Sequence, residues 1–182
     1  MKYRQHQGFT MIEVLVAILI VVFGILGTAA LDTTAKSGTF DASQRTLATA
    51  LAADILERMS ANPQGVEDGA YNGSYGGGSV AAAGCAGLAA SCNAAELAAA
   101  DLYEWEQQLL GSQVTLGNAD IGGLVNVSGC IQNTDGLITV VVVWRGKSSL
   151  TDPSTGADAF VKGCGLTGGY RRQVVIQTFI DT

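Results

Sequence analysis

The chain has 182 residues, which is enough for one domain with an appendage but small for two independent hydrophobic cores. Its formal charge is -6, from 10 Lys and Arg against 16 Asp and Glu, and no segment gathers basic side chains into a stripe. A nucleic-acid partner is therefore not expected, because affinity for the phosphate backbone depends on such basic surfaces. Although 24 residues are Gly, 48% are apolar, so we expect a folded chain.

A short polar segment, residues 1–8, precedes a long apolar run. The segment carries Lys2 and Arg4, and the run of 23 residues from Phe9 to Leu31 holds a single charge, Glu13. As a helix this run would reach roughly 35 Å, enough to cross a hydrocarbon core of about 30 Å. The run is therefore predicted to span a membrane.

Positive charges precede this span, so the positive-inside rule predicts that the N-terminus lies in the cytoplasm. The residues after the span are then predicted to lie on the other side of the membrane. The predicted parts are a leader at 1–8, a membrane-spanning half-helix at 9–31, and an exported head at 32–182.

Two simpler interpretations of the apolar run stay open. It could be a secretory signal peptide cut after the small residues Thr28, Ala29 and Ala30, or a plain membrane anchor. A cleaved signal normally has a shorter apolar region of about 7 to 15 residues. Neither interpretation explains Glu13, because an ionised side chain in a spanning helix is costly and usually marks a partner.

The six residues from Gly8 to Glu13, read as GFTMIE, stand at the start of the apolar run. This segment resembles the class III leader of type IV pilins and of type II secretion pseudopilins. The resemblance implies that a prepilin peptidase cuts between Gly8 and Phe9 and that Phe9 is then N-methylated. It also implies that Glu13 attracts the amino terminus of a neighbouring subunit and sets the register of assembly.

Physical chemistry supports a partner for Glu13. Cleavage would create an amine at Phe9, and opposite charges attract far more strongly in a low-dielectric setting than in water. Glu13 lies four residues after Phe9, so it could also offset its own terminus within one helix. We expect pairing between subunits, because setting register is a well-attested role for a costly buried charge.

Cleavage after Gly8 would also change the chemistry of the chain. It removes Lys2, Arg4 and His6, which leaves a formal charge of -8 and no histidine. Ser-His and Cys-His nucleophiles and metal sites that contain histidine are then excluded. We expect no enzyme activity, no cofactor and no metal site.

The helix is predicted to continue from Phe9 to Ser60, a length of roughly 78 Å. Leu47, Leu51, Ile55 and Met59 recur at every fourth residue and form an amphipathic stripe. Asn62-Pro63 should end the helix, because the residue before proline disfavours the α conformation. In the type IV pilin fold, such a helix has one half that protrudes and one half packed on a globular head.

The rest of the chain is predicted to form an α+β head. Residues 64–92 are interpreted as a long loop, and Asn93 starts a helix to Leu110 through a capping box with Glu96. Leu97, Leu102, Trp105 and Leu109 approximate one face of this helix, with Trp105 in the core.

Three strands are expected after this helix, in an antiparallel sheet of three or four strands. One holds residues 124–131, a β-branched run at 137–144 forms a central strand after the Asp135-Gly136 turn, and 170–180 forms the last. Residues 145–169 are interpreted as a loop.

Four cysteines lie in the exported part, where an even count suggests two disulfides with three possible pairings. We favour Cys85 with Cys92 and Cys130 with Cys164. The first closes a local loop, and the second ties the Gly-rich loop to a strand. A zinc site built from all four is disfavoured, because neither pair has zinc-ligand spacing.

The middle of the chain sharpens the resemblance to minor pilins of type IV pili, the PilV group in particular. The segments that carry it are Arg45–Ala48, Asp54–Pro63, Asp101–Trp105 and Thr139–Trp144. The resemblance implies a complex with other minor pilins and the major pilin at an inner-membrane assembly platform, which primes fibre assembly and sits at the tip. Major pilins usually carry a proline in the first part of this helix, whereas this chain has none before Pro63.

Other functions share parts of this pattern. A minor pseudopilin of type II secretion has the same leader and spine, whereas a major pseudopilin would need a calcium site, for which Asp152 and Asp158 are too few. A membrane-anchored adhesin or binding module is a different class. An anchored enzyme is the weakest alternative, because no nucleophile and base are paired in the sequence.

Overall fold

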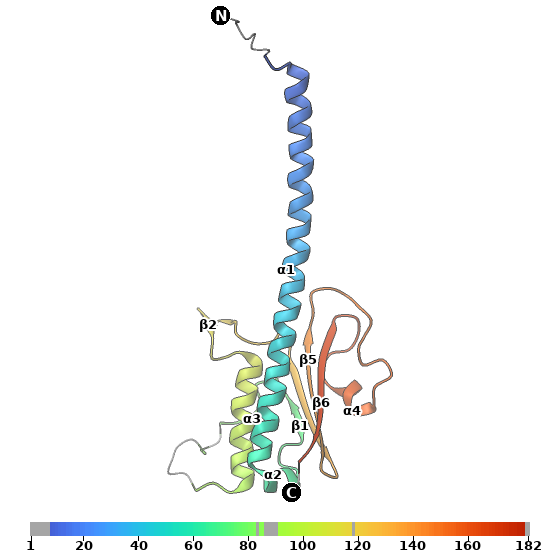
Figure 1. Ribbon diagram of the computed structural model, residues 1–182. Coiled ribbons are helices and arrows are strands. Elements are labelled where there is room, and N and C mark those ends of the chain that lie inside the picture. The colour runs from blue at the N-terminus through green and yellow to red at the C-terminus, as the bar shows by residue number, and fades with distance from the viewer. Residues whose placement is uncertain (1–7, 83, 86–90, 118, 181–182) are drawn as a thin grey trace, which may run out of the picture. The chain divides into compact units, whose positions relative to one another are not determined.

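The computed structural model describes residues 8–82, 84, 85, 91–117 and 119–180. The leader residues Lys2, Arg4 and His6 therefore lie outside the described residues. The elements in chain order are α1 (Met11–Ala61), α2 (Pro63–Glu67), β1 (Gly73–Tyr75), α3 (Ala94–Leu110), β2 (Thr115–Leu116), β3 (Ala119–Asp120), β4 (Ser128–Thr134), β5 (Leu137–Arg145), α4 (Ala159–Gly163) and β6 (Arg171–Phe179) (Figure 1).

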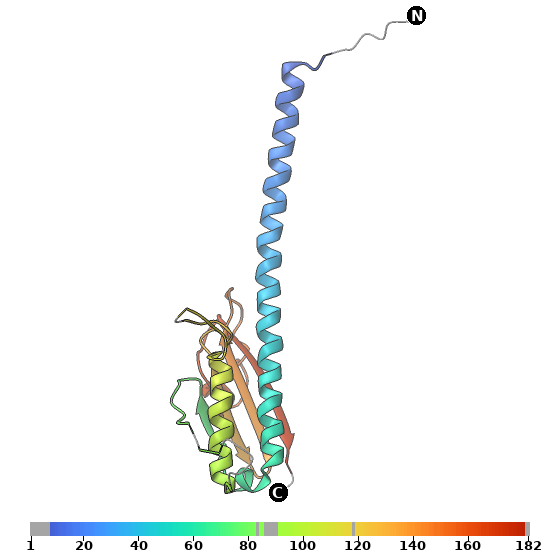
Figure 2. The ribbon, with the colours of Figure 1, turned by 90° about the vertical axis from the view of Figure 1, so that its left-hand side faces the viewer.

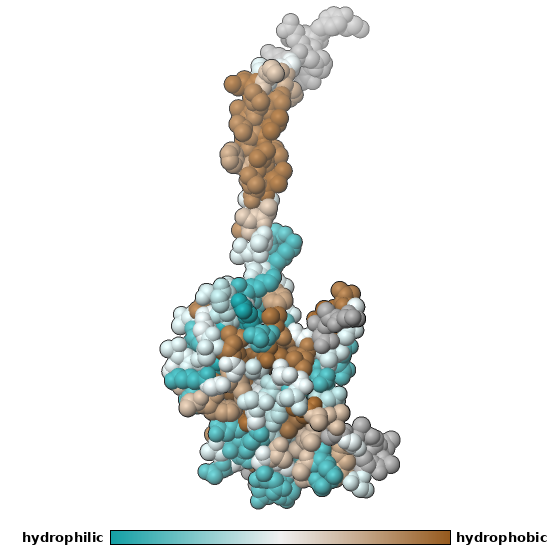
Figure 3. All heavy atoms as spheres, turned by 180° about the vertical axis from the view of Figure 1, so that it is seen from behind, coloured by the Kyte–Doolittle hydropathy of each residue, from teal (hydrophilic) through white to brown (hydrophobic). Residues whose placement is uncertain are grey.

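The chain divides into two compact units, residues 1–40 and residues 41–182. The predicted boundary between residues 31 and 32 concerns the edge of a membrane and stays a prediction. In the first unit α1 continues without interruption through Gly24 and Gly27. Its large apolar side chains from Phe9 to Leu31 are exposed, and Figure 3 shows the apolar surface that they form.

Within the second unit, the last part of α1 supplies one wall of the core. Ile55 and Met59 are completely buried, Leu51 is nearly so, and Leu47 is partly buried against them. The predicted stripe is confirmed, and α1 ends at Ala61, directly before Asn62-Pro63. Small residues share this face, because Ala48 and Ala52 are also buried.

The segment 64–92 is not a simple loop, and that prediction was wrong in part. Pro63 starts the short helix α2, where its lack of a backbone N–H costs nothing, and the Asn62 side chain caps it by accepting from the Gly65 N–H. The segment then contributes β1 to the sheet. A strand of three residues is too short to show a period of two in the sequence.

Helix α3 has the predicted ends. The Asn93 side chain accepts from the Glu96 N–H, and the Glu96 carboxylate accepts from the Asn93 N–H. Gly111 ends the helix in the left-handed conformation. Trp105 is completely buried, as predicted. Leu97 was placed on this face wrongly, because it is 37% exposed and Ala98 is the buried residue.

The main sheet is antiparallel, with the order β1-β4-β5-β6. In register, Val141 lies between Cys130 of β4 and Val175 of β6. Seven consecutive residues of β5 are buried, which confirms the predicted central strand. Figures 1 and 2 show α3 alongside the last part of α1, and the core joins both helices to one face of the sheet. The α+β class is therefore as expected.

Three local predictions need correction. Strand β4 begins at Ser128 and not near residue 124, because the chain turns first and Asn126 takes a positive φ of 50°. The small sheet of β2 and β3 was not foreseen. The loop at 145–169 contains α4, which the Asp158 side chain caps by accepting from the Val161 N–H.

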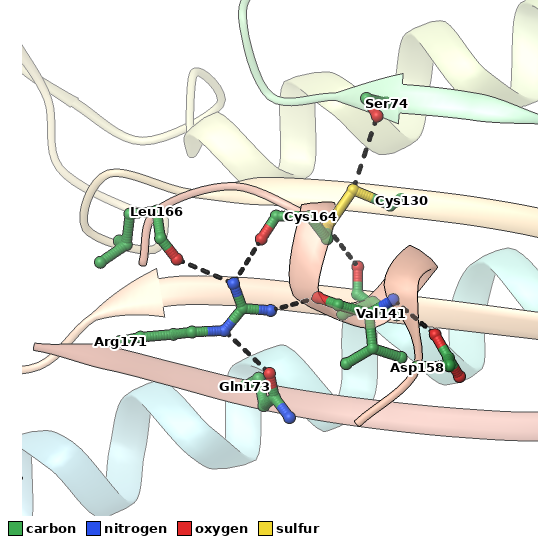
Figure 4. Close-up of a disulfide and its surroundings, with 9 residues drawn as sticks. Ser74, Cys130, Val141, Asp158, Cys164, Leu166, Arg171 and Gln173 are labelled. Carbon is green, nitrogen blue, oxygen red and sulfur yellow. Dashed lines mark hydrogen bonds between the residues drawn. A yellow bond between two sulfur atoms is a disulfide. The ribbon is translucent and has the colours of Figure 1, made fainter. Parts of the chain in front are cut away.

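Two disulfides join the same pairs that the sequence analysis favours, Cys85 with Cys92 and Cys130 with Cys164. The second links β4 to the residue after α4, on the sheet face opposite the helices (Figure 4). There it belongs to a second small core with Val141, Val143 and Val161.

Candidate functional site

The N-terminal motif lies at the start of α1, where Thr10 organises the first turn. The Thr10 hydroxyl accepts from the Glu13 N–H at 3.3 Å, and the Thr10 carbonyl accepts from the N–H groups of Glu13 and Val14. A threonine at this position satisfies N–H groups that a helix start leaves unpaired. The motif therefore places Glu13 in the first turn of a regular helix.

Glu13 lies on an apolar face of that helix. Phe9, Glu13, Ala17 and Val21 follow one another at intervals of four residues and line one shallow groove. Glu13 is exposed and Phe9 is 83% exposed. Among the described residues, no side chain donates a hydrogen bond to the Glu13 carboxylate or forms an ion pair with it. The face thus presents one unpaired anion on an otherwise apolar surface.

Among the described residues, α1 is the helix long and apolar enough to cross a membrane. Its apolar stretch is long enough to anchor the chain in a membrane. An unpaired carboxylate on such a stretch can attract a cation from another chain, since low dielectric strengthens the attraction. Whether Phe9 of the same chain or of a neighbour supplies that cation stays a prediction, because the amine exists only after cleavage.

Residues 3–30 match the family described as the prokaryotic N-terminal methylation motif. The chain carries the class III leader of type IV pilin-like proteins. The matched segment includes Gly8, Phe9 and Glu13, and it implies processing by a prepilin peptidase and membrane association in a pilus or a secretion system. With the long helix packed on a small antiparallel sheet, the structure is consistent with the type IV pilin fold. No curated protein and no solved structure matches the chain.

The head contains an ionic cluster that sequence reasoning missed. The Arg58 guanidinium on α1 donates to Asp54 at 3.0 Å and reaches across to Asp101 and Glu104 of α3, at 3.3 and 2.8 Å. Burial alone would lower the pKa of Arg58, but the hydrogen bonds to these acids outweigh it and the pKa is raised. The cluster holds α1 against α3. Of its contacts, only the pair of Asp54 and Arg58, four residues apart on one helix, could have been predicted from sequence spacing.

A buried carboxylate holds the glycine-rich segment to α3. Glu106 is completely buried, and it accepts from the N–H groups of Gly76 and Val80 at 2.8 Å and of Gly78 at 3.1 Å. Burial, helped by the charge of Glu106, raises the pKa of Tyr75 to about 12. Nothing in the sequence distinguishes Glu106 from an exposed helical glutamate, because its partners are backbone groups far away in the chain.

A buried arginine organises the loop between β5 and β6 (Figure 4). Arg171 is completely buried and donates to the carbonyl groups of Val161, Cys164 and Leu166. Asp152 accepts from the Ser154 and Gly168 N–H groups, and these bonds hold the pKa of Asp152 below its usual range.

Asp152 and Asp158, the acids considered for calcium, thus bond to backbone groups of their own loop. In the part of the chain that the structure describes, no group of three or more histidine, cysteine or acidic residues could hold a metal. The four cysteines form disulfides.

Proposed function

We propose that this protein is a minor pilin of a type IV pilus, of the PilV kind, and that it helps to prime fibre assembly within a minor-pilin complex. The observation that carries the proposal is the methylation motif at the start of the exposed apolar run 9–31. Glu13 is the single charge in this run, and no described residue pairs with it. An apolar helix of this kind needs a lipid or protein environment, and the charge needs a cationic partner.

In this proposal a prepilin peptidase on the cytoplasmic face cuts between Gly8 and Phe9. The methylated amine of Phe9 on one subunit and the carboxylate of Glu13 on its neighbour then set the axial register. The chain spans the inner membrane once, with its head in the periplasm, until it joins the fibre. Its partners are the other minor pilins, the major pilin and the inner-membrane assembly platform, and its role involves no catalysis and no cofactor.

A position at the tip follows from the priming role, because a subunit that starts a fibre leads it outward. The absence of proline in α1 supports a minor subunit, since major pilins usually carry a proline in the first part of this helix.

A minor pseudopilin of type II secretion is the second candidate, because the methylation motif supports both classes equally. A strain that lacks this protein distinguishes the two functions. We expect loss of surface pili, restored by the full-length chain, with secretion of folded exoproteins unchanged. Sheared pili should contain the protein at far lower abundance than the major subunit. Normal pili with impaired secretion would instead assign it to the secretion system.

A further inference from the structure

A pocket of about 470 Å³ lies in the second unit, residues 41–182. Asp41 and Arg45 of α1 line it together with Trp144 of β5 and Arg172 of β6, and the loop after β5 adds Leu150 and Pro153. Its walls are mostly apolar, and Leu150 is 61% exposed, so the pocket is accessible from solvent.

Two of the residues that line this pocket each have a buried polar atom without a hydrogen-bond partner among the described residues. These atoms are the indole Nε1 of Trp144 and the Oδ1 of Asp41. Trp144 is only 2% exposed. The other tryptophan behaves differently, because Nε1 of Trp105 donates to the Leu51 carbonyl at 2.8 Å. Buried polar groups are nearly always paired, so an unpaired donor and an unpaired acceptor on two residues that line one pocket indicate an external partner.

The nearby cations do not supply that partner. Asp32 and Asp54 each form an ion pair with the basic residue four positions later, whereas no ion pair joins Asp41 to Arg45 in the described chain. The Arg172 guanidinium donates instead to backbone carbonyls, among them that of Ser148 at 2.7 Å. Asp41 and Arg45 therefore stay available to another molecule.

The chemistry of the pocket selects one class of occupant. An inorganic anion would meet the Asp41 carboxylate, and a purely aliphatic ligand would leave both polar atoms unpaired. A polypeptide backbone offers N–H donors and carbonyl acceptors together, and it also carries apolar side chains. We infer that this pocket binds an extended segment of another subunit, whose backbone bonds to Trp144 and Asp41 and whose apolar side chain packs on Leu150 and Pro153.

That the occupant is a subunit rests on the proposed assembly function. Site-specific photo-crosslinking in the native membrane tests it, with p-benzoylphenylalanine in place of Leu150 in the full-length chain. The matched control carries it in place of Leu116, a leucine that is 72% exposed and does not line the pocket. We expect Leu150, and not Leu116, to yield an adduct with another protein that has the methylation motif, identified by mass spectrometry.

A second variant tests the hydrogen bond itself. Trp144→Phe keeps an aromatic ring but removes the N–H donor, so the yield of this adduct should fall about fivefold to tenfold. Equal adducts from Leu150 and Leu116, no adduct from Leu150, or a yield that Trp144→Phe leaves unchanged would overturn the inference.

If the Trp144→Phe protein does not accumulate, the variants Leu150→Glu and Leu116→Glu are tested instead, because both positions are exposed. Only Leu150→Glu should reduce incorporation into pili, and equal incorporation would contradict the inference. These results can contradict the pocket inference without contradicting the proposed function. A chain that enters pili without using this pocket would still be a minor pilin. A chain that never enters pili would contradict both.

Discussion

At the scale of single residues, Glu13 is the side chain whose position is hardest to explain by stability. It is an exposed carboxylate on an apolar helix face, and no described residue pairs with it. Glu13→Ala should leave cleavage of the leader intact but reduce the amount of this protein in sheared pili at least about tenfold, the effect of losing roughly 1.4 kcal/mol. Immunoblots of pili and membranes measure both quantities.

Charge and size at position 13 can be separated. Glu13→Gln keeps the size and should fail like the alanine variant, whereas Glu13→Asp keeps the charge and should retain partial incorporation. Normal incorporation of Glu13→Gln would show that the carboxylate does not act through its charge.

Asp152 gives a prediction for pH. Its hydrogen bonds to Ser154 and Gly168 lower the pKa in the folded protein, so the fold favours the ionised form. This contribution to stability is complete above the ordinary aspartate pKa of about 3.9 and is lost as the pH falls through the lower folded value. Asp152→Asn should therefore destabilise the protein at neutral pH and much less in strong acid.

Thermal unfolding of the full-length chain in detergent measures this effect at about pH 7 and about pH 2. Glu57→Gln, which changes an exposed carboxylate on α1, serves as the control. If Asp152→Asn lowered the unfolding temperature by the same amount at both pH values, the stabilising role of the ionised Asp152 would be contradicted.

At the scale of elements, sequence patterns predicted the long ones and missed the short ones. Helix α3 was marked by its own caps, and β5 by a continuous β-branched run. The short α2, β1 and α4 were not marked, because elements of three to five residues show no periodicity. The positions of α2 and α4 depend on bonds from residues far along the chain or across the fold, which form only in the folded chain. Asn133 donates to the Val66 carbonyl of α2, and Arg171 donates to the Val161 carbonyl of α4.

Glu106 joins two elements and gives a test at this scale. Its two carboxylate oxygens accept from the N–H groups of Gly76, Gly78 and Val80. In Glu106→Gln the amide NH₂ would face an N–H donor, so the free energy of unfolding should fall by about 2–3 kcal/mol. Amide hydrogen exchange at these three residues should accelerate, while exchange in β5 changes less.

Urea unfolding in detergent measures the first effect and exchange mass spectrometry the second, with Glu57→Gln again as the matched variant. Unchanged exchange at Gly76 and Gly78 would show that the carboxylate does not hold this segment.

At the scale of the whole molecule, the two disulfides close chain segments of different length. Cys85 and Cys92 are separated by 7 positions, and Cys130 and Cys164 by 34. In the chain-entropy model these crosslinks contribute about 2.4 and about 4 kcal/mol. Replacing Cys130 and Cys164 together by alanine should therefore destabilise the head more than the same change at Cys85 and Cys92. Equal losses in urea unfolding would contradict this order.

The N-terminal motif and the pocket beside Trp144 differ in how far they could be predicted from the sequence. The N-terminal motif is local, so adjacent residues from Gly8 to Glu13 reveal it in the sequence. The pocket beside Trp144 could not be found in this way. Asp41 and Trp144 are about a hundred positions apart in the sequence, and only folding brings them to one pocket. The methylation motif is therefore readable from the sequence, whereas the pocket is not.

The mass of the N-terminal peptide, from protein extracted from its native membrane, tests the central claim most directly. Cleavage after Gly8 predicts a peptide that begins with N-methylated Phe9, and a variant with a bulky residue at position 8 should accumulate uncut. An intact Met1 in the parent chain would contradict processing by a prepilin peptidase, and a start near Leu31 would instead indicate a cleaved secretory signal.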